Sequence, residues 1–219
     1  MEFDHIFICV SSRAPEAEKL KVFGLTEGTS NKHPGQGTAN RRFFFHNAFI
    51  EFLYLDNPNE INNDITKPTQ LSERFVSHKS TASPFGICFR PESNTTNKAV
   101  PFKSWEYRPT YLPETLKVDI GVAPITEPMW FFLSFSSRPD QQFDTKRQPM
   151  EHSVGFKEIT SMRIYIPAET YSDPATHANN TNGIEIIKAD KHLIEIGFDK
   201  ETCKKSHNFM PTLPLIFKW

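Results

Sequence analysis

Short apolar runs, most of them rich in aromatic and β-branched residues, alternate with polar stretches along the whole chain. The most apolar run covers residues 41–55 and reads RRFFFHNAFIEFLYL, with Asn47 and Ala48 near its middle. Such residues favour strands, and a polar break between two runs favours a turn. The pattern therefore predicts a buried hairpin whose strands are residues 42–45 and 49–55.

The residues before this hairpin predict a strand, a helix and a polar loop. If residues 3–10 form a strand, successive side chains point to opposite faces, so His5 lies on the opposite face from Ile6 and Ile8. Pro15 suits the first turn of a helix and Gly24 suits its end. Together with the hairpin these elements make a βαβββ unit, if one further short strand lies within residues 25–30.

The rest of the chain predicts more strands than helices. Helices are expected near residues 70–78 and 174–179, and residues 92–128 should be mostly extended chain and turns because they are rich in proline. Residues 204–219 form an apolar tail that should pack against the body of the protein, since it would otherwise be exposed. Strands are predicted at 83–91, 128–136, 161–166, 183–188 and 192–198, the last two paired as a hairpin.

Composition and charge exclude several classes of partner. A net charge of -1 gives no electrostatic reason to expect binding to nucleic acid or to an anionic membrane. The apolar runs are too short to span a bilayer, and the first residues, MEFD, lack the basic start of a signal peptide. Three cysteines argue against a secreted disulfide framework. We therefore expect a cytoplasmic protein.

Two charged residues in apolar strands are candidates for a functional site. Glu51 interrupts an apolar strand, and its burial costs several kcal/mol unless a cation, a metal or hydrogen-bond donors meet it. Arg90 ends a strand face that begins with the small residues Gly86 and Cys88. Its guanidinium is suited to bind a carboxylate or phosphate with two hydrogen bonds, or to neutralise Glu51 across a cavity. Both alternatives are compatible with the sequence.

Three segments share one outline, which suggests an internal repeat. Each has an opening strand and a closing strand with one unusual residue in it. The aligned opening strands are 5–8, 86–89 and 163–166, and the aligned closing strands are 49–52, 132–135 and 193–196.

With the Asp4-His5 pair, the loop HPGQGTAN from His33 and the sequence FIEFL around Glu51, the chain resembles the vicinal oxygen chelate superfamily, in particular its glyoxalase-like members. The resemblance is best over residues 3–135. It implies an α+β fold in which paired βαβββ modules form a curved, half-open, barrel-like sheet of the glyoxalase/bleomycin-resistance type. It also implies a divalent metal ion, with His5 and Glu51 at two ligand positions.

The other aligned positions depart from the ligand pattern of the superfamily. The central segment has Gly86 and Ser134 there, which offer no good ligand for a divalent ion. The last segment has Arg163 and Glu195, and an arginine cannot bind a metal because it stays protonated. Arg163 and Glu195 are therefore expected to face each other as an ion pair, or else to bind a substrate carboxylate.

The resemblance leads to one domain over residues 1–219. Its parts are a first module, a central module, a C-terminal module and a packed tail, at about 1–56, 83–136, 157–200 and 204–219.

Two hypotheses for function follow. In the first, His5 and Glu51 are catalytic residues and metal ligands, and the protein is an enzyme acting on a small oxygenated molecule, by lyase, isomerase or dioxygenase chemistry. In the second, the same cavity binds or sequesters a small molecule without a metal. The partner is a small-molecule ligand in both hypotheses, and a homodimer is compatible with either. The predicted ligand-binding residues are Arg90, His33, Trp105, Tyr107 and Arg108.

Overall fold

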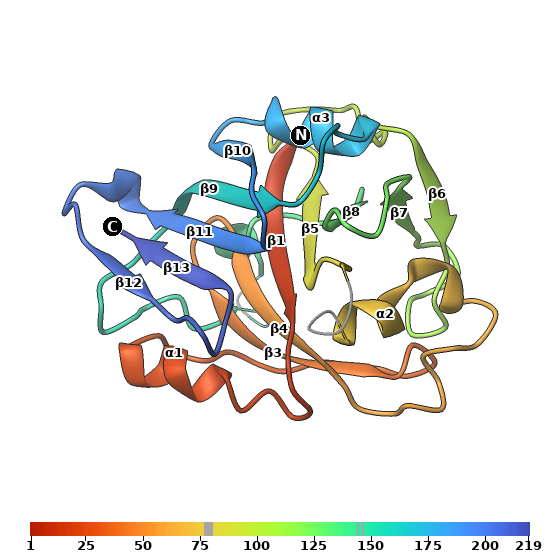
Figure 1. The fold of residues 1–219 in the computed structure, drawn as a ribbon, viewed down its shortest axis with the longest axis horizontal. Coiled ribbons are helices and arrows are strands. Elements are labelled where there is room, and N and C mark those ends of the chain that lie inside the picture. The colour runs from red at the N-terminus through yellow and green to blue at the C-terminus, as the bar shows by residue number, and fades with distance from the viewer. Residues whose placement is uncertain (77–80, 144, 146) are drawn as a thin grey trace.

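The computed structural model describes residues 1–76, 81–143, 145 and 147–219, which form two β-sheets and a few short helices (Figure 1). The larger sheet has the strand order β2-β3-β4-β1-β5-β8-β7-β6, and the smaller has the order β10-β9-β11-β13-β12. The strands of the larger sheet are β1 (Glu2–Cys9), β2 (Lys32–His33), β3 (Thr38–Phe44), β4 (Phe49–Leu55), β5 (Phe85–Arg90), β6 (Ser104–Tyr107), β7 (Val118–Gly121) and β8 (Met129–Phe132). Those of the smaller sheet are β9 (Ile159–Ile166), β10 (Ile184–Lys188), β11 (Leu193–Phe198), β12 (Ser206–Asn208) and β13 (Leu215–Lys218).

The larger sheet is built from two halves with the same strand arrangement. In the first half β1 lies parallel to β4, and in the second half β5 lies parallel to β8. The halves join where β1 and β5 pair in antiparallel fashion. The eight strands curl into a half-barrel, so the predicted α+β fold with paired modules and a curved sheet is confirmed.

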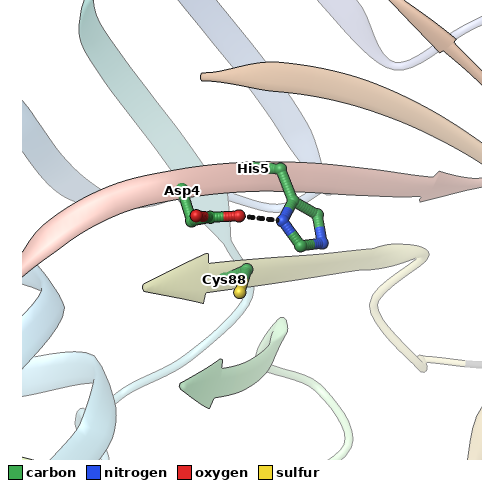
Figure 2. Close-up of side chains that lie close together, drawn as sticks. All are labelled: Asp4, His5 and Cys88. Carbon is green, nitrogen blue, oxygen red and sulfur yellow. Dashed lines mark hydrogen bonds and ion pairs between the residues drawn. The ribbon is translucent and has the colours of Figure 1, made fainter. Parts of the chain in front are cut away.

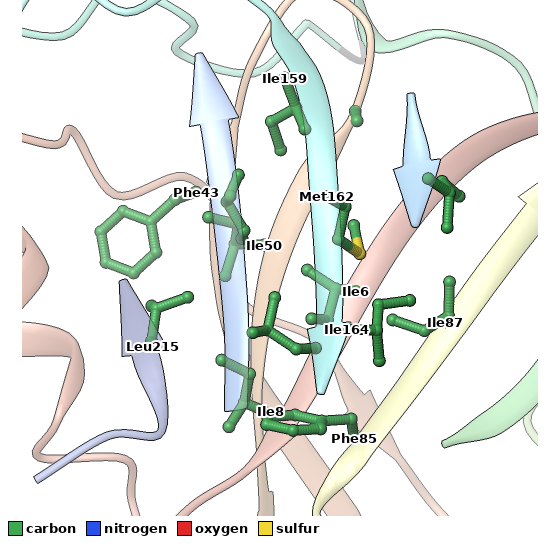
Figure 3. Close-up of a cluster of buried hydrophobic side chains, with 14 of the residues drawn as sticks. Ile6, Ile8, Phe43, Ile50, Phe85, Ile87, Ile159, Met162, Ile164 and Leu215 are labelled. Carbon is green, nitrogen blue, oxygen red and sulfur yellow. The ribbon is translucent and has the colours of Figure 1, made fainter. Parts of the chain in front are cut away.

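The two faces of this sheet have different neighbours. Ile6 and Ile8 of β1, with Ile50 of β4, belong to a hydrophobic core shared with the smaller sheet, from which Ile164 and Leu215 reach in (Figure 3). Burying a side chain of this size contributes about 1.5–3 kcal/mol. The opposite face carries His5 and Phe7 of β1 together with Glu51 of β4, and it lines a cavity.

The central hairpin is confirmed, although its first strand is longer than predicted. β3 and β4 pair in antiparallel fashion, with Phe44 opposite Phe49 and Arg42 opposite Glu51. β3 begins at Thr38, so part of the predicted polar loop is strand. No strand lies within residues 25–30, which the structure describes in full; β2 follows them instead.

The smaller sheet corrects the predicted hairpin of residues 183–188 and 192–198. α3 (Asp173–Asn179) connects β9 to β10 as a crossover, so that β10 lies parallel to β9. β11 pairs with the other edge of β9, which therefore separates the two strands. The predicted packing of the tail is confirmed, because β13 continues this sheet beside β11 and buries Phe217.

The remaining helices are short. α1 (Ala17–Phe23) ends at Gly24, whose φ of 113° is left-handed and whose N–H donates to the carbonyls of Leu20 and Lys21. α2 (Leu71–Phe75) is shorter than the helix predicted at 70–78, of which residues 77 and 78 lie outside the described residues. Single-turn 3-10 helices are Lys67–Thr69, Pro139–Gln141 and Asp199–Glu201. In the described parts of the chain, no helix has the length and apolar character that crossing a bilayer requires.

Candidate functional site

The cavity has a volume of about 320 Å³ and lies on the face of the larger sheet that does not pack against the smaller sheet. A volume of this size is at the lower end of the range for small-molecule sites. Its apolar walls include Phe7, Leu53, Val118, Met129 and Phe131. Its polar lining residues are His5, Asn31, His33, Gln36, Asn40, Arg42, Glu51, Tyr107 and Tyr111.

His5 is held by a carboxylate from the neighbouring residue. Its Nδ1 lies 2.5 Å from Oδ1 of Asp4, and both side chains are buried (Figure 2). Burial would raise the pKa of Asp4, but the hydrogen bond and charge of His5, the charge of Arg90 and the Ser136 hydroxyl outweigh it, and the pKa is lowered. An ionised Asp4 accepts a hydrogen bond from Nδ1, so in the neutral imidazole Nε2 is the nitrogen that can accept a proton.

Glu51 meets this Nε2 from the adjacent strand. Its Oε2 lies 3.6 Å from Nε2 of His5, and its Oε1 accepts a hydrogen bond of 2.7 Å from the amide of Asn40. His5 and Glu51 thus lie on adjacent strands and face one cavity, as their strand phases predicted. Asn40 is the donor that a buried Glu51 required, and it comes from β3, the other neighbour of β4.

Arg90 lies outside the cavity, which corrects the prediction that it reaches a ligand there. Its Nη1 donates to Asp4 Oδ2 at 3.2 Å, and its Nη2 donates to Glu2 Oε2 at 3.0 Å. The side chain is only 2% exposed. Arg90 does lie on the predicted strand face, but at the end of β5, next to the start of β1, where the two carboxylates satisfy it. It acts on the site through Asp4.

A metal site needs three or more ligand atoms close together, and one such group occurs among the described residues. It consists of Asp4, His5 and Cys88, whose candidate ligand atoms lie within 4.8 Å of one another (Figure 2). Asp4 already accepts from His5, Arg90 and Ser136, and the Arg90 cation beside it opposes a second cation. Burial raises the pKa of the Cys88 thiol well above its usual value, so the sulfur is protonated. This group does not fit a divalent ion.

A metal ion bound by His5 and Glu51 would need further ligands, and the second half of the sheet does not supply them. β5 and β8 pair so that Gly86 lies opposite Met129. If Gly86 corresponds to His5, then Phe131, and not Ser134 as aligned from sequence, corresponds to Glu51. Neither Gly86 nor Phe131 offers a ligand atom. The cavity is also lined by His33, but among the described residues His5, His33 and Glu51 do not come close enough together to form a ligand group, so the set for a metal is incomplete.

A polar wall formed by the loop between β2 and β3 faces this pair. The Tyr107 hydroxyl donates to Gln36 Oε1 at 2.9 Å, and Gln36 Nε2 donates to the Thr38 hydroxyl at 2.7 Å. His33 Nδ1 lies 2.9 Å from the same hydroxyl, and its ring packs beside Tyr111. Burial lowers the pKa of His33, although the charge of Glu51 acts in the opposite direction. His33 and Tyr107 thus line the cavity, as predicted.

Trp105 and Arg108, by contrast, are not brought to this cavity. Trp105 lines a smaller hollow beside Arg74 on another part of the surface. Arg108 is 53% exposed and binds Glu106 at 2.9 Å. The three residues 105, 107 and 108 span an edge strand and its end, and only Tyr107 of these points into the cavity.

Sequence reasoning missed Arg42, Asn40, Gln36 and Tyr111. The first two could have been found from the hairpin, because a register that places Phe44 opposite Phe49 also places Arg42 opposite Glu51. Gln36 and Tyr111 lie in loops, and no periodic pattern predicts where a loop side chain points.

Arg163 and Glu195 are cross-strand partners in β9 and β11, with 3.8 Å between Nη1 and Oε2. The prediction that they face each other is confirmed. Lys218 also binds Glu195, at 2.6 Å, and Glu201 binds Arg163, at 3.1 Å. β9 and β11 are antiparallel, whereas β1 and β4 are parallel, so this pair does not repeat the His5–Glu51 arrangement.

Comparisons with known proteins agree with the fold. A family model described as a glyoxalase-like domain matches residues 3–179. A crystal structure of a hypothetical protein from Staphylococcus aureus is similar over 99% of this chain and 98% of that chain, with a TM-score of 0.55 and 14% sequence identity. At this identity the similarity concerns the fold alone. The comparison with curated proteins found no match.

Proposed function

The chain belongs to the family of glyoxalase-like domains, and we propose that its cavity binds a small oxygenated organic molecule and moves a proton at a carbon atom beside the carbonyl group of that molecule. The observation that carries this proposal is the line of side chains from Asp4 through His5 to Glu51. It ends in a cavity of small-molecule size with aromatic walls.

His5 is the proton acceptor in this proposal. In the neutral ring its Nε2 has the lone pair, because the hydrogen bond to Asp4 selects the tautomer with the hydrogen on Nδ1. After proton transfer the imidazolium lies between two carboxylates, Asp4 at 2.5 Å and Glu51 at 3.6 Å, which stabilise its charge. Positioned general bases of this kind contribute about 10²–10⁴-fold to a rate.

Glu51 has the second role. The gap of 3.6 Å between its Oε2 and Nε2 of His5 is too long for a direct hydrogen bond, so both atoms are available to a bound molecule. Asn40 fixes the carboxylate through the other oxygen. While the Glu51 carboxylate stabilises the imidazolium, His5 can return the same proton to a neighbouring atom of the ligand, which makes the overall change an isomerisation. No step requires a metal, in keeping with the incomplete ligand set.

The second hypothesis, a binding protein without catalysis, is favoured by one observation. Much of the cavity wall is aromatic or aliphatic, from Phe7, Leu53 and Phe131, and such walls bind a ligand without reacting with it. The two hypotheses share the cavity and differ in what His5 does.

Hydrogen exchange separates them. Phenylacetone, a neutral ketone with acidic methylene hydrogens, is incubated in D₂O with EDTA, and loss of the methylene signal is followed by NMR. We expect the protein to accelerate exchange, and His5→Gln to reduce the acceleration by about 100-fold or more. Glu51→Gln should reduce it as well.

The control is His177→Gln, which removes an exposed imidazole on α3 and should change nothing. Exchange that is as fast in His5→Gln as in the wild type would disprove the role of His5. Binding of phenylacetone without any acceleration would favour the non-catalytic hypothesis.

A further inference from the structure

We infer that the ligand of this cavity is an organic acid and that Arg42 binds its carboxylate. This inference rests on the proposed function, since it assigns the class of molecule that His5 and Glu51 act on. Arg42 lines the cavity and is partly buried. In the described parts of the chain, no carboxylate lies within ion-pair distance of it.

The contacts of Arg42 orient its guanidinium without neutralising it. Nε donates to the Thr29 carbonyl at 2.8 Å, and Nη2 donates to the Thr29 hydroxyl at 3.1 Å and to Asn31 Oδ1 at 3.2 Å. All three acceptors are uncharged. Nη1 has no hydrogen-bond partner among the described residues. The guanidinium is therefore held in place, while its Nη1 group can still donate hydrogen bonds and its charge is not paired with a carboxylate.

Comparison with the other arginines sets Arg42 apart. Arg41, its neighbour in β3, binds Glu18 and Glu27, and Arg90 binds two carboxylates. Arg74 is also without a carboxylate, but it donates to three backbone carbonyls and does not line this cavity. Arg42 is thus the cation that an anionic ligand in the cavity would meet.

The position of Arg42 relative to His5 suits one small molecule. The guanidinium carbon lies over the rings of Phe44, at 5.0 Å, and Phe49, at 5.9 Å. The ring of Phe49 stacks on His5, with 4.2 Å between centroids and 14° between planes. Arg42 and His5 therefore lie against the same aromatic ring, so a molecule held by its carboxylate at Arg42 extends along Phe49 towards Nε2 of His5.

The rest of the cavity determines the other end of the ligand. The remaining titratable groups that line it, apart from the two tyrosines, are His5, His33 and Glu51. Glu51 is directed to Asn40 and His5, and although its charge acts on Arg42 from the paired strand, the two form no ion pair. Met129 and Phe131 form an apolar wall across the cavity. The class of ligand is a small carboxylic acid with a carbonyl group near the carboxylate and an apolar body, such as an aromatic 2-oxo acid.

Phenylpyruvate and phenylacetone test this inference as a matched pair, because they differ only in a carboxylate that replaces a methyl group. Dissociation constants are measured by calorimetry. We expect the wild type to bind phenylpyruvate at least about tenfold more tightly than phenylacetone, as for a charged hydrogen-bonded pair. Arg42→Met should lose this preference and keep its affinity for phenylacetone, while Arg42→Lys should retain part of it.

Arg108→Met is the control for net charge, since it removes an exposed arginine and should leave the preference intact. A preference that survives in Arg42→Met, equal binding of the two molecules by the wild type, or binding of neither would overturn the inference. The proposed function fails separately, if His5→Gln leaves the exchange of phenylacetone unchanged. Unfolding curves of each variant show whether a loss of binding is a loss of structure.

Discussion

At the scale of single residues, Asp4 connects the cavity to the interior of the protein. It accepts hydrogen bonds from His5, Arg90 and Ser136, all at 3.2 Å or less. One carboxylate therefore fixes the tautomer of His5 and neutralises a buried arginine. Carboxylates that orient a functional histidine are a common device in active sites, because they hold the ring and stabilise its charged form.

Arg90→Met should destabilise the protein strongly. The substitution leaves Asp4 buried without its cation, and breaking a buried ion pair from one side costs about 3–5 kcal/mol. Urea unfolding at pH 7 measures this loss. From the sequence alone Arg90 was expected to bind a ligand or to neutralise Glu51, because the sequence could not show that Asp4 and Glu2 are its partners.

The same variant should also unfold at a higher pH on acidification. In the wild type the pKa of Asp4 is lowered, so its contribution to stability is complete above about pH 4 and is lost as the pH falls through the lower, folded-state pKa. Removal of Arg90 takes away one cause of that lowered pKa, so the loss begins at higher pH. Unchanged acid unfolding and unchanged urea unfolding together would show that Asp4 does not depend on Arg90. Arg108→Met serves as the control in both experiments, the urea unfolding at pH 7 and the acid unfolding.

At the scale of elements, the contact of β1 with β5 explains why one expected ligand position is a glycine. Gly86 lies opposite Phe7, and a side chain at position 86 would meet the ring of Phe7. That ring also lines the cavity. The space that a ligand residue on β5 would need is therefore already filled by an aromatic side chain of β1.

Gly86→Ala should destabilise the protein by about 1–3 kcal/mol, as overpacking does in a dense interior. Phe7→Leu, which removes the crowding ring, should reduce the cost of Gly86→Ala when the two substitutions are combined. Thermal unfolding of the four proteins in this double-mutant cycle measures the coupling. If the cost of Gly86→Ala is the same with either residue at position 7, the two do not compete for space.

The strands show what a sequence can predict about this site and what it cannot. The alternation of side chains along a strand predicted which face of the sheet His5, Glu51 and Arg90 occupy, and the predicted face is correct for all three. Alternation does not determine how far along a strand a side chain lies from a cavity, because that depends on the register with a neighbour distant in sequence. For this reason the prediction that Arg90 reaches the cavity was wrong. The predicted hairpin of residues 183–188 and 192–198 was wrong for the same reason, because β9 lies between β10 and β11.

At the scale of the whole molecule, the smaller sheet supports the cavity from behind. β1 carries cavity residues on one face and core residues on the other, and the core is completed by β9, β11 and β13. Phe217 of β13 is fully buried and packs edge-to-face on Phe198, with 4.9 Å between ring centroids. The tail is therefore part of the core behind the site.

Phe217→Ala should lower the free energy of unfolding by about 3–5 kcal/mol, because it deletes a buried ring and leaves a cavity. Val22→Ala is the control: Val22 is 88% exposed on α1, and its substitution should change stability by about 0.5 kcal/mol or less. Urea unfolding compares the two variants with the wild type. A neutral Phe217→Ala would show that the tail is not needed for the packed core.

The two walls of the cavity are chemically different, and this has a stereochemical consequence. One half of the sheet supplies the ionisable side chains of His5 and Glu51, beside Phe7 and Leu53, while the other half supplies Val118, Met129 and Phe131 together with Tyr107. A molecule with one polar and one apolar end therefore fits in a single orientation and presents a single face to His5. If His5 is the proposed base, then of the two hydrogens on a methylene group, which are equivalent in solution, only the one that points towards His5 would be removed. In the proposed reaction, the asymmetry of the two halves would thus make the removal of a proton from an achiral molecule selective for one of its prochiral hydrogens.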